Sequence, residues 1–378
     1  MGPWSQGTRS ARQVSQGTAA VRARGVRGLT RRAGRRYPSA PGRGDAPRRR
    51  QRRRGAATRR GRRPGRDLCE IADLSPAEAC AVLAAATRVL PLAEGAGARE
   101  LPILRGAQIL SVFSEPSTRT RLSFEVAARR LGAEVVHFVQ DAASSASKGE
   151  TERDALQNLD AMGFDAVVVR DRRDGVPRAW TEVMRARVVN AGDGVNEHPT
   201  QALLDALTIL EAFGRAPTQG AMTGLRVAVC GDVRHGRVAH SDLQLFRTLG
   251  AQCVVAGPGD LAPPELAARL GATVAPTLDD ALAGADVAVM LRIQRERLGA
   301  DVAIPDAPSY HAAWGLTPAR LALLAPGAIV MHPGPINRGV EIADAVADGP
   351  QSRILRQVTL GVAVRMAVLA RACGVELL

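Results

Sequence analysis

Residues 113–125 read Phe-Ser-Glu-Pro-Ser-Thr-Arg-Thr-Arg-Leu-Ser-Phe-Glu, a stretch that predicts a strand passing directly into a helix. The apolar run Ile109–Phe113 is typical of a buried strand, and Pro116 interrupts it. From Thr118 onward, apolar residues recur at the spacing of a helix. A strand that leads into a helix is the basic unit of a parallel α/β sheet.

The first turn of that helix has the composition of a phosphate site. Ser117, Thr118 and Thr120 place hydroxyls beside the unpaired N–H groups of a helix N-terminus, where the helix dipole favours an anion. Arg119 and Arg121 add guanidinium groups that match phosphate geometry. A serine cap followed by a solvated basic turn would need far fewer of these groups. We therefore expect this turn to bind a phosphate group.

Strand-like runs alternate with helical stretches along the rest of the chain, which predicts parallel sheets with helices on both faces. We divide the strands into two groups of four on either side of a helix at 199–213, with residues 214–224 as the linker. The strands are expected at residues 109–113, 134–139, 166–169, 188–190, 227–231, 252–256, 287–291 and 328–332. The predicted class is α/β, with two doubly wound domains.

Charge is distributed unevenly along the chain. The 378 residues carry a formal net charge of +14, and residues 1–66 supply about +20 through 21 Arg and one acid, Asp45. The remainder is therefore mildly acidic and needs no nucleic-acid partner. Residues 1–66 hold few large apolar side chains and are expected to form a disordered extension.

Four interpretations of residues 1–66 are open. The segment fits a basic arm for RNA or DNA, an organelle presequence, an arm that binds a partner protein, or upstream sequence wrongly included in the reading frame. Its only large aromatic residues are Trp4 and Tyr37, fewer than a nucleic-acid arm would interleave with its arginines. We favour the fourth interpretation.

The sequence gives no sign of a membrane span, a metal site or a cofactor. We expect no apolar stretch to reach the length of a span, and the N-terminus lacks a secretory leader. The five cysteines are scattered without a Cys-x-x-Cys pair, and the six histidines never occur at ligand spacing. These features favour a reduced, cytoplasmic setting.

Lysine occurs once, at Lys148, among 51 basic residues. In a chain that otherwise uses arginine, a single lysine indicates a position that a planar guanidinium does not fit. A compact ammonium reaches a phosphate inside a crowded pocket. The alternative is chance retention of one surface lysine.

Further motifs lie after the predicted strands. Arg170 closes a strand at the carboxyl edge of the first sheet, where ligands of open α/β folds bind. His198 and Gln201 begin a helix at a spacing of three, which puts them on one face. Arg237 and Arg292 follow strands of the second half, and two separate arginines suit the two ends of a dicarboxylate.

A final motif, His332-Pro-Gly-Pro335, ends the last predicted strand. Its two prolines lack N–H donors, so the motif leaves carbonyl groups that can accept hydrogen bonds from an NH₂ group. Together with the motifs above, it resembles the aspartate/ornithine carbamoyltransferase family over residues 67–375 or so.

The resemblance implies a set of ligands for carbamoyl phosphate. They are Ser117, Thr118, Arg119, Thr120, Ser144, Lys148, Arg170, His198, Gln201, Pro333 and Gly334. Ser144 and Lys148 would come from a loop of the neighbouring subunit, which makes the protein at least a homotrimer with shared active sites. His198 would donate to the carbamoyl oxygen, and Gln201 would accept from the carbamoyl NH₂. A cis bond is expected at Gly334–Pro335.

The resemblance also implies catalytic and acceptor-binding residues, with no cofactor and no metal. The catalytic residues are Arg119, Thr120, Lys148, Arg170 and His198, and the aspartate ligands are Lys148, Arg170, Arg237, Arg292 and Gln294. Aspartate is favoured over ornithine because the chain lacks a Ser-Met-Gly loop and has Gly334 where ornithine enzymes carry a cysteine. The implied reaction gives N-carbamoyl-L-aspartate and phosphate, a step of de novo pyrimidine biosynthesis.

The same resemblance sets the domains. Residues 67–200 with 355–378 would form the carbamoyl phosphate-binding domain, and 201–354 the aspartate-binding domain. The last helix, 354–373, would return to the first domain. A regulatory chain or a dihydroorotase is an expected type of partner, whereas a membrane is not and nucleic acid is unlikely.

Two carboxylates depart from the family pattern: Asp171 follows Arg170, and Glu197 precedes His198. We expect them to raise the pKa of His198 or to repel an anionic substrate. They leave two alternatives open, a paralogue with another amino acceptor and a non-catalytic relative that binds nucleic acid through the basic arm.

Overall fold

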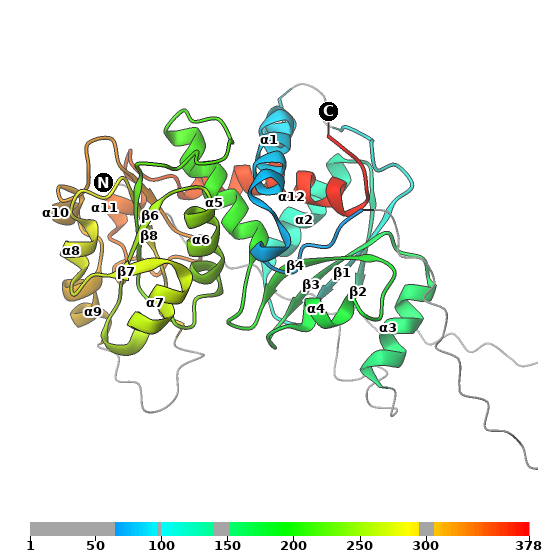
Figure 1. The fold of residues 1–378 in the computed structure, drawn as a ribbon, viewed down its shortest axis with the longest axis horizontal. Coiled ribbons are helices and arrows are strands. Elements are labelled where there is room, and N and C mark those ends of the chain that lie inside the picture. The colour runs from blue at the N-terminus through cyan, green and yellow to red at the C-terminus, as the bar shows by residue number, and fades with distance from the viewer. Residues whose placement is uncertain (1–64, 97–99, 139–150, 295–305, 378) are drawn as a thin grey trace, which may run out of the picture. The chain divides into compact units, whose positions relative to one another are not determined.

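The computed structural model describes residues 65–96, 100–138, 151–294 and 306–377. Two parallel sheets organise these residues, with strand orders β2-β1-β3-β4 and β7-β6-β5-β8-β9 (Figure 1). The first sheet contains β1 (Gln108–Phe113), β2 (Glu134–Phe138), β3 (Ala166–Asp171) and β4 (Arg187–Asp193). The second contains β5 (Arg226–Cys230), β6 (Gln252–Ala256), β7 (Ala272–Val274), β8 (Val287–Met290) and β9 (Ile329–Met331). The predicted α/β class is confirmed.

The eight predicted strands are all present, with small shifts at their ends, but the prediction of four strands in each half was wrong. The second sheet has a fifth strand, β7, at its edge. Its three residues include two that are exposed. Such a short edge strand has no apolar run, so the sequence offered no signal for it.

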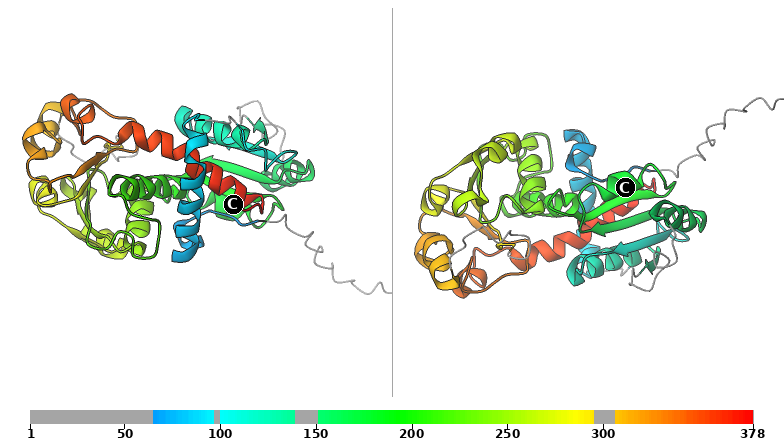
Figure 2. Two further views of the ribbon diagram at one scale, coloured as in Figure 1. Left: turned by 90° about the horizontal axis from the view of Figure 1, so that it is seen from above. Right: turned by 90° about the horizontal axis from the view of Figure 1, so that it is seen from below.

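Helices cover both faces of each sheet (Figures 1 and 2). In the first sheet, Ala166 and Val168 of β3 pack into one apolar cluster, while Val167 and Val169 pack into another on the opposite side. The strands are thus buried on both faces, which explains their unbroken apolar sequences. The cluster that contains Val168 also takes in Val229 of the second sheet, so the two sheets share part of one core.

The helices begin where the sequence provides caps. The Ser75 hydroxyl accepts from the N–H of Glu78, whose side chain reaches back to Ser75 and so completes a capping box. The main helices are α1 (Pro76–Ala93), α2 (Thr118–Arg130), α3 (Glu152–Ala161), α4 (Val176–Trp180), α5 (Pro199–Ala212), α6 (Arg237–Thr248), α7 (Pro264–Leu270), α8 (Leu278–Leu282), α9 (Ala307–Trp314), α10 (Pro318–Leu321), α11 (Asp344–Ala347) and α12 (Ile354–Ala372). Two 3₁₀ turns cover Ile71–Asp73 and Gly259–Leu261.

The last helix, α12, runs back to the first sheet as expected. It packs against α1, α2 and α5 (Figure 2). Twelve of its 19 residues are buried, Leu360 and Val364 among them. Helix α12 therefore connects the end of the second sheet to the helices that cover the first.

The expectation that no apolar segment reaches the length of a membrane span was wrong. Helix α1 is long and apolar enough to cross a membrane by length and composition. One such helix is weak evidence, because the core helix of a soluble protein passes the same test. Leu83 and Ala86 of α1 are fully buried in the main apolar cluster. The predicted disordered extension, residues 1–66, lies outside the described residues apart from Gly65 and Arg66.

Candidate active site

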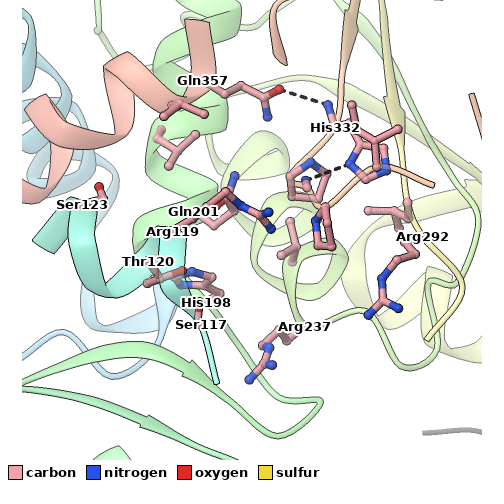
Figure 3. A pocket seen from close by; sticks show the side chains of 18 of the residues that line it. Ser117, Arg119, Thr120, Ser123, His198, Gln201, Arg237, Arg292, His332 and Gln357 are labelled. Atoms are coloured by element: carbon pink, nitrogen blue, oxygen red, sulfur yellow. Dashed lines mark hydrogen bonds between the residues drawn. The ribbon is translucent and has the colours of Figure 1, made fainter. Parts of the chain in front are cut away.

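The predicted phosphate turn forms one wall of a pocket of about 630 Å³ (Figure 3). Helix α2 begins at Thr118, directly after Ser117, and the Ser117 hydroxyl makes no capping hydrogen bond. That hydroxyl is therefore not used to satisfy the helix end. Figure 3 has Ser117 and Thr120 on one side of the pocket and Arg292 and His332 on the other.

Residues from both sheets line this pocket. Of the predicted site residues, those that line it are Ser117, Thr118, Arg119, Thr120, Arg170, His198, Gln201, Arg237, Arg292, Gln294, Pro333 and Gly334. They lie at or just beyond the carboxyl ends of strands, the edge at which open α/β sheets bind ligands. Ser144 and Lys148 lie outside the described residues.

The pocket is strongly cationic. Its described lining includes five arginines and two carboxylates, Glu115 and Asp232. Glu115 accepts from Arg170 at 3.0 Å and from Arg237 at 2.6 and 2.8 Å. It therefore connects Arg170 on β3 of the first sheet with Arg237 on α6, the helix after β5 of the second sheet. The excess of arginine suits a ligand with several negative charges.

Arg119 lies close to the second-sheet side of the pocket. Burial and the nearby charge of Arg292 lower its pKa. Gly334 lies against it, since a Cβ atom at Gly334 would come within 3.3 Å of the Arg119 guanidinium carbon. The guanidinium groups of Arg119 and Arg292 repel each other, and an anion bound between them would relieve this repulsion.

His198 is held as a neutral imidazole. Burial, followed by the charges of Arg170, Arg365 and Arg237, lowers its pKa well below the usual value. Its Nδ1 is buried and has no hydrogen-bond partner among the described residues. The expected rise in the pKa of His198 was therefore wrong, because burial and the charges of three arginines lower the pKa and neither extra carboxylate is among the groups that shift it.

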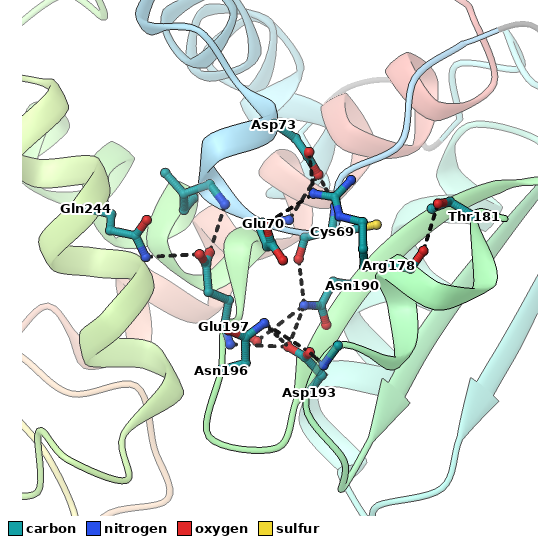
Figure 4. A network of polar contacts seen from close by, with 12 residues as sticks. Cys69, Glu70, Asp73, Arg178, Thr181, Asn190, Asp193, Asn196, Glu197 and Gln244 are labelled. Atoms are coloured by element: carbon teal, nitrogen blue, oxygen red, sulfur yellow. Dashed lines mark hydrogen bonds and ion pairs between the residues drawn. The ribbon is translucent and has the colours of Figure 1, made fainter. Parts of the chain in front are cut away.

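Glu197 and Asp171 point away from the pocket. The Glu197 carboxylate accepts from the N–H of Ile71 at 2.8 Å and from Gln244 at 3.0 Å (Figure 4). Although burial opposes it, hydrogen bonds from Arg173 lower the pKa of Asp171. Neither residue lines the pocket, so neither repels an anion there.

A hydrogen-bonded turn holds the carbonyl groups after β9. The Gly334 N–H donates to His332 Nδ1 at 2.8 Å, so the proton lies on Nε2, which donates to Glu341 at 3.1 Å. The Gly334–Pro335 bond is cis, as expected. The buried Glu341 carboxylate thereby fixes the turn that carries Pro333 and Gly334.

The sequence analysis missed several lining residues, among them Glu115, Asp232, Gln357 and Arg365. Glu115 was given no role, although its place at a strand end marks it as a candidate. Arg365 had a usable signal, because it is a lone charge in the apolar middle of α12. Asp232 and Gln357 had no comparable signal.

The described residues contain no group of three or more His, Cys, Asp or Glu side chains that could hold a metal ion. The polar groups of the pocket are mainly hydrogen-bond donors and cations. This set favours a polyanionic organic ligand.

Comparison with known proteins agrees with this geometry. Residues 66–211 match the carbamoyl-P binding domain of the aspartate/ornithine carbamoyltransferases, and residues 223–372 match the Asp/Orn binding domain. The aspartate carbamoyltransferase catalytic subunit of Sorangium cellulosum is 51% identical over 306 residues, which cover 81% of this chain and 92% of the relative. This chain belongs to the aspartate/ornithine carbamoyltransferase family.

Solved structures of the family share the fold. The aspartate transcarbamoylase of Trypanosoma cruzi in complex with carbamoyl phosphate is 31% identical, with a TM-score of 0.70 over 83% of this chain and 97% of that one. The ornithine carbamoyltransferase of Thermus thermophilus is 27% identical, with a TM-score of 0.70 over 81% and 98%.

Proposed function

We propose that this protein transfers the carbamoyl group of carbamoyl phosphate to the amino group of L-aspartate, giving N-carbamoyl-L-aspartate and phosphate. The observation that carries the proposal is the cationic pocket, in which the turn at 117–120 and the second-sheet arginines face one ligand volume. Phosphate at the helix N-terminus and two carboxylates at the arginines account for both sets of cations. Arg292 lies on the second-sheet side of the pocket, where it would repel the cationic side chain of ornithine.

The proposed roles follow the chemistry of the side chains. Ser117, Thr118 and Arg119 bind the phosphate, while Arg170 and Thr120 stabilise negative charge on the carbonyl oxygen as the amine attacks. Neutral His198 keeps one N–H and so donates to the same oxygen. Aspartate is bound by Arg170, Arg237, Arg292 and Gln294, and Pro333 and Gly334 offer carbonyl groups to the carbamoyl NH₂.

Neither carboxylate among the described lining residues is available to act as a strong base. Their two carboxylates are already engaged, Glu115 with arginines and Asp232 with His235 and the N–H of Gln294. We therefore infer that the departing phosphate takes the proton lost by the attacking amine.

A carbamoylation assay with aspartate and ornithine as competing acceptors tests the function. We expect turnover with aspartate, none with ornithine, and loss of about 10²-fold or more of the rate in His198→Ala, because an oxyanion donor is removed. The surface variant His137→Ala serves as the control and should keep full activity. Turnover with ornithine alone would overturn the assignment of the acceptor.

We also propose a cytoplasmic homotrimer in which the neighbouring subunit's Ser144 and Lys148 complete each site. Support comes from exposed apolar side chains on α2, where Leu122 and Val126 are 48% and 38% exposed. Exposed apolar groups on a helix favour burial against another chain.

Hybrid complementation tests the shared site. Lys148→Ala and His198→Ala chains are each expected to be inactive, but hybrids formed from both should regain activity, because some sites then escape both changes. Sedimentation should give the mass of a trimer for each variant. Trimers that form as hybrids and stay inactive would mean that Lys148 serves its own subunit.

A further inference from the structure

Two fully buried aspartates lie behind the pocket, where neither touches its lining surface. Asp205 belongs to α5 and Asp242 to α6, and these helices pack against each other. The two carboxyls face each other. Neither oxygen of Asp242 has a hydrogen-bond partner outside this pair among the described residues.

Asp205 is a hub for two side chains that do line the pocket. Gln201 Nε2 lies 3.1 and 3.2 Å from the two Asp205 oxygens, and Gln357 Nε2 lies 2.6 Å from Oδ1. Gln357 in turn accepts the backbone N–H of His332 at 3.0 Å (Figure 3). One carboxyl thus connects α5, α12 and the turn that carries Pro333 and Gly334.

The direction of these hydrogen bonds is fixed at one end. The backbone N–H of His332 can only donate, so Gln357 must offer its oxygen there and its NH₂ to Asp205. Asp205 therefore accepts from Gln357. If it also accepts from Gln201, the Gln201 oxygen is left for the pocket, as an acceptor for an NH₂ group.

The surroundings put a single proton on Asp242. Burial raises the pKa of Asp205 to about 7, although the amide groups of Gln201 and Gln357 and the buried Arg365 guanidinium favour its charged form. Asp242 has no such donor, and the Cys253 thiol near it offers no countercharge. Burial and the neighbouring Asp205 carboxylate raise the pKa of Asp242 well above the usual value. Two adjacent carboxylates without a cation between them do not both ionise.

We propose that Asp205 and Asp242 share one proton, carried by Asp242, and that the resulting Asp205 carboxylate is a positioning group for the carbamoyl NH₂. The Asp205 carboxylate orients the Gln201 amide directly, and it orients the turn after β9 through Gln357. This inference rests on the proposed function, since the Gln201 oxygen is taken to accept a hydrogen bond from the NH₂ group of carbamoyl phosphate.

Binding of two phosphates tests the positioning role. Carbamoyl phosphate carries an NH₂ group where acetyl phosphate carries a CH₃ group. The ratio of their dissociation constants therefore reports only on the part of the pocket that binds the NH₂ group. The wild-type full-length chain should bind carbamoyl phosphate at least about tenfold more tightly, because acetyl phosphate leaves the buried acceptors unpaired. No binding of carbamoyl phosphate to the wild type would count against the proposed function itself.

Asp205→Asn should abolish most of this discrimination. Its amide NH₂ would face an amide NH₂ of Gln201 or Gln357, so the Gln201 amide turns and presents NH₂ to the pocket. Affinity for carbamoyl phosphate should fall by about tenfold while affinity for acetyl phosphate changes little. Gln357→Met removes both the donor to Asp205 and the acceptor of the His332 N–H, and it should reduce the discrimination in the same direction.

Two matched variants separate positioning from stability. Asp160→Asn changes another buried aspartate, paired with Arg185 at 2.7 Å, and should lower the melting temperature without altering the ratio of the two affinities. Asp242→Asn replaces the acid proton by an amide donor, so the ratio should persist. Unchanged discrimination in both Asp205→Asn and Gln357→Met would overturn the positioning role.

Infrared difference spectroscopy tests the proton without measuring activity. At pH 7 the wild type should give the C=O band of a buried protonated carboxyl group, shifted by ¹³C-labelled aspartate. The band should disappear in Asp242→Asn and remain in Asp160→Asn. A wild type without this band, or a band unaffected by Asp242→Asn, would overturn the shared proton.

Discussion

At the scale of single residues, small side chains make room for the charged ones. Gly192, at the end of β4, has a φ of +112°. A Cβ atom there would lie 2.9 Å from Nη1 of Arg170 and 3.3 Å from Nη1 of Arg237. Glycine at this position therefore permits both arginines to reach Glu115 and the pocket.

Gly192→Ala should weaken phosphate binding as well as stability. The alanine strains the backbone and displaces Arg170, so we expect about 1–3 kcal/mol lost from the free energy of unfolding and a rise of about tenfold or more in the KM for carbamoyl phosphate. Gly284→Ala is the control, with a φ of +67° and open space around its Cβ. Equal effects of both changes on KM would contradict the argument.

His198 should make the fold sensitive to acid. Its pKa is lowered in the folded state, so the unfolded chain binds more protons below about pH 6.5 and stability falls as the pH drops toward the folded-state pKa. His198→Gln should flatten the decline in melting temperature between about pH 6.5 and 5. The pKa of half-buried His240 is also lowered, so part of the decline should persist. An identical slope in wild type and variant would show that His198 is not held neutral.

At the scale of secondary-structure elements, α12 carries a charge into the core. Arg365 is 4% exposed, donates to Ser123 at 2.7 Å, and lies 5.1 Å from the centre of the Phe124 ring. Gly361, one turn earlier, allows this, since a Cβ atom there would lie 2.7 Å from Arg365 Nη1. The helix thus supplies a buried cation to the wall of the pocket, and its charge acts on both His198 and Asp205.

Arg365→Met should weaken the binding of carbamoyl phosphate by about tenfold, because the change removes a buried positive charge near the anion. Arg356→Met, on the same helix, removes an exposed arginine paired with Glu211 and Glu94 and should change affinity and stability by less than about 1 kcal/mol. Calorimetric titration of both variants checks the difference. Equal affinities would remove Arg365 from the electrostatics of the site.

At the scale of the whole molecule, Arg66 attaches the start of the described residues to α1 and α12. The N–H of Arg66 donates to the carbonyl of Arg371 at 3.3 Å, and its guanidinium pairs with Glu78. Residues 1–64 carry 20 arginines and one acid, Asp45, so they account for the net positive charge of the chain. Their composition cannot add an apolar core.

Deletion of residues 1–64 should therefore leave the melting temperature, the trimer and the carbamoylation rate essentially unchanged. Filter binding of RNA by the full-length and shortened chains serves as a parallel measurement, since any affinity should follow the basic segment. A loss of several degrees, or of assembly, would mean that the segment packs against the remainder.

The local sequence was sufficient for the α/β class, the eight predicted strands and the cis bond at Gly334–Pro335. Each depends on patterns within a few residues or on a family motif, so each could be predicted without knowing which segments meet. The residues that line the pocket were likewise predicted in large part, because ligands bind beyond the carboxyl ends of parallel strands.

Other features depended on contacts between distant segments. Glu197 was expected beside the ring of His198, but its side chain turns to Ile71, 126 positions earlier in the chain. The lowered pKa of His198 comes from burial and from the charges of arginines on β3, α6 and α12, and the Asp205–Asp242 pair exists only because α5 packs on α6. Burial and electrostatic fields arise from such packing, which one segment of sequence does not contain.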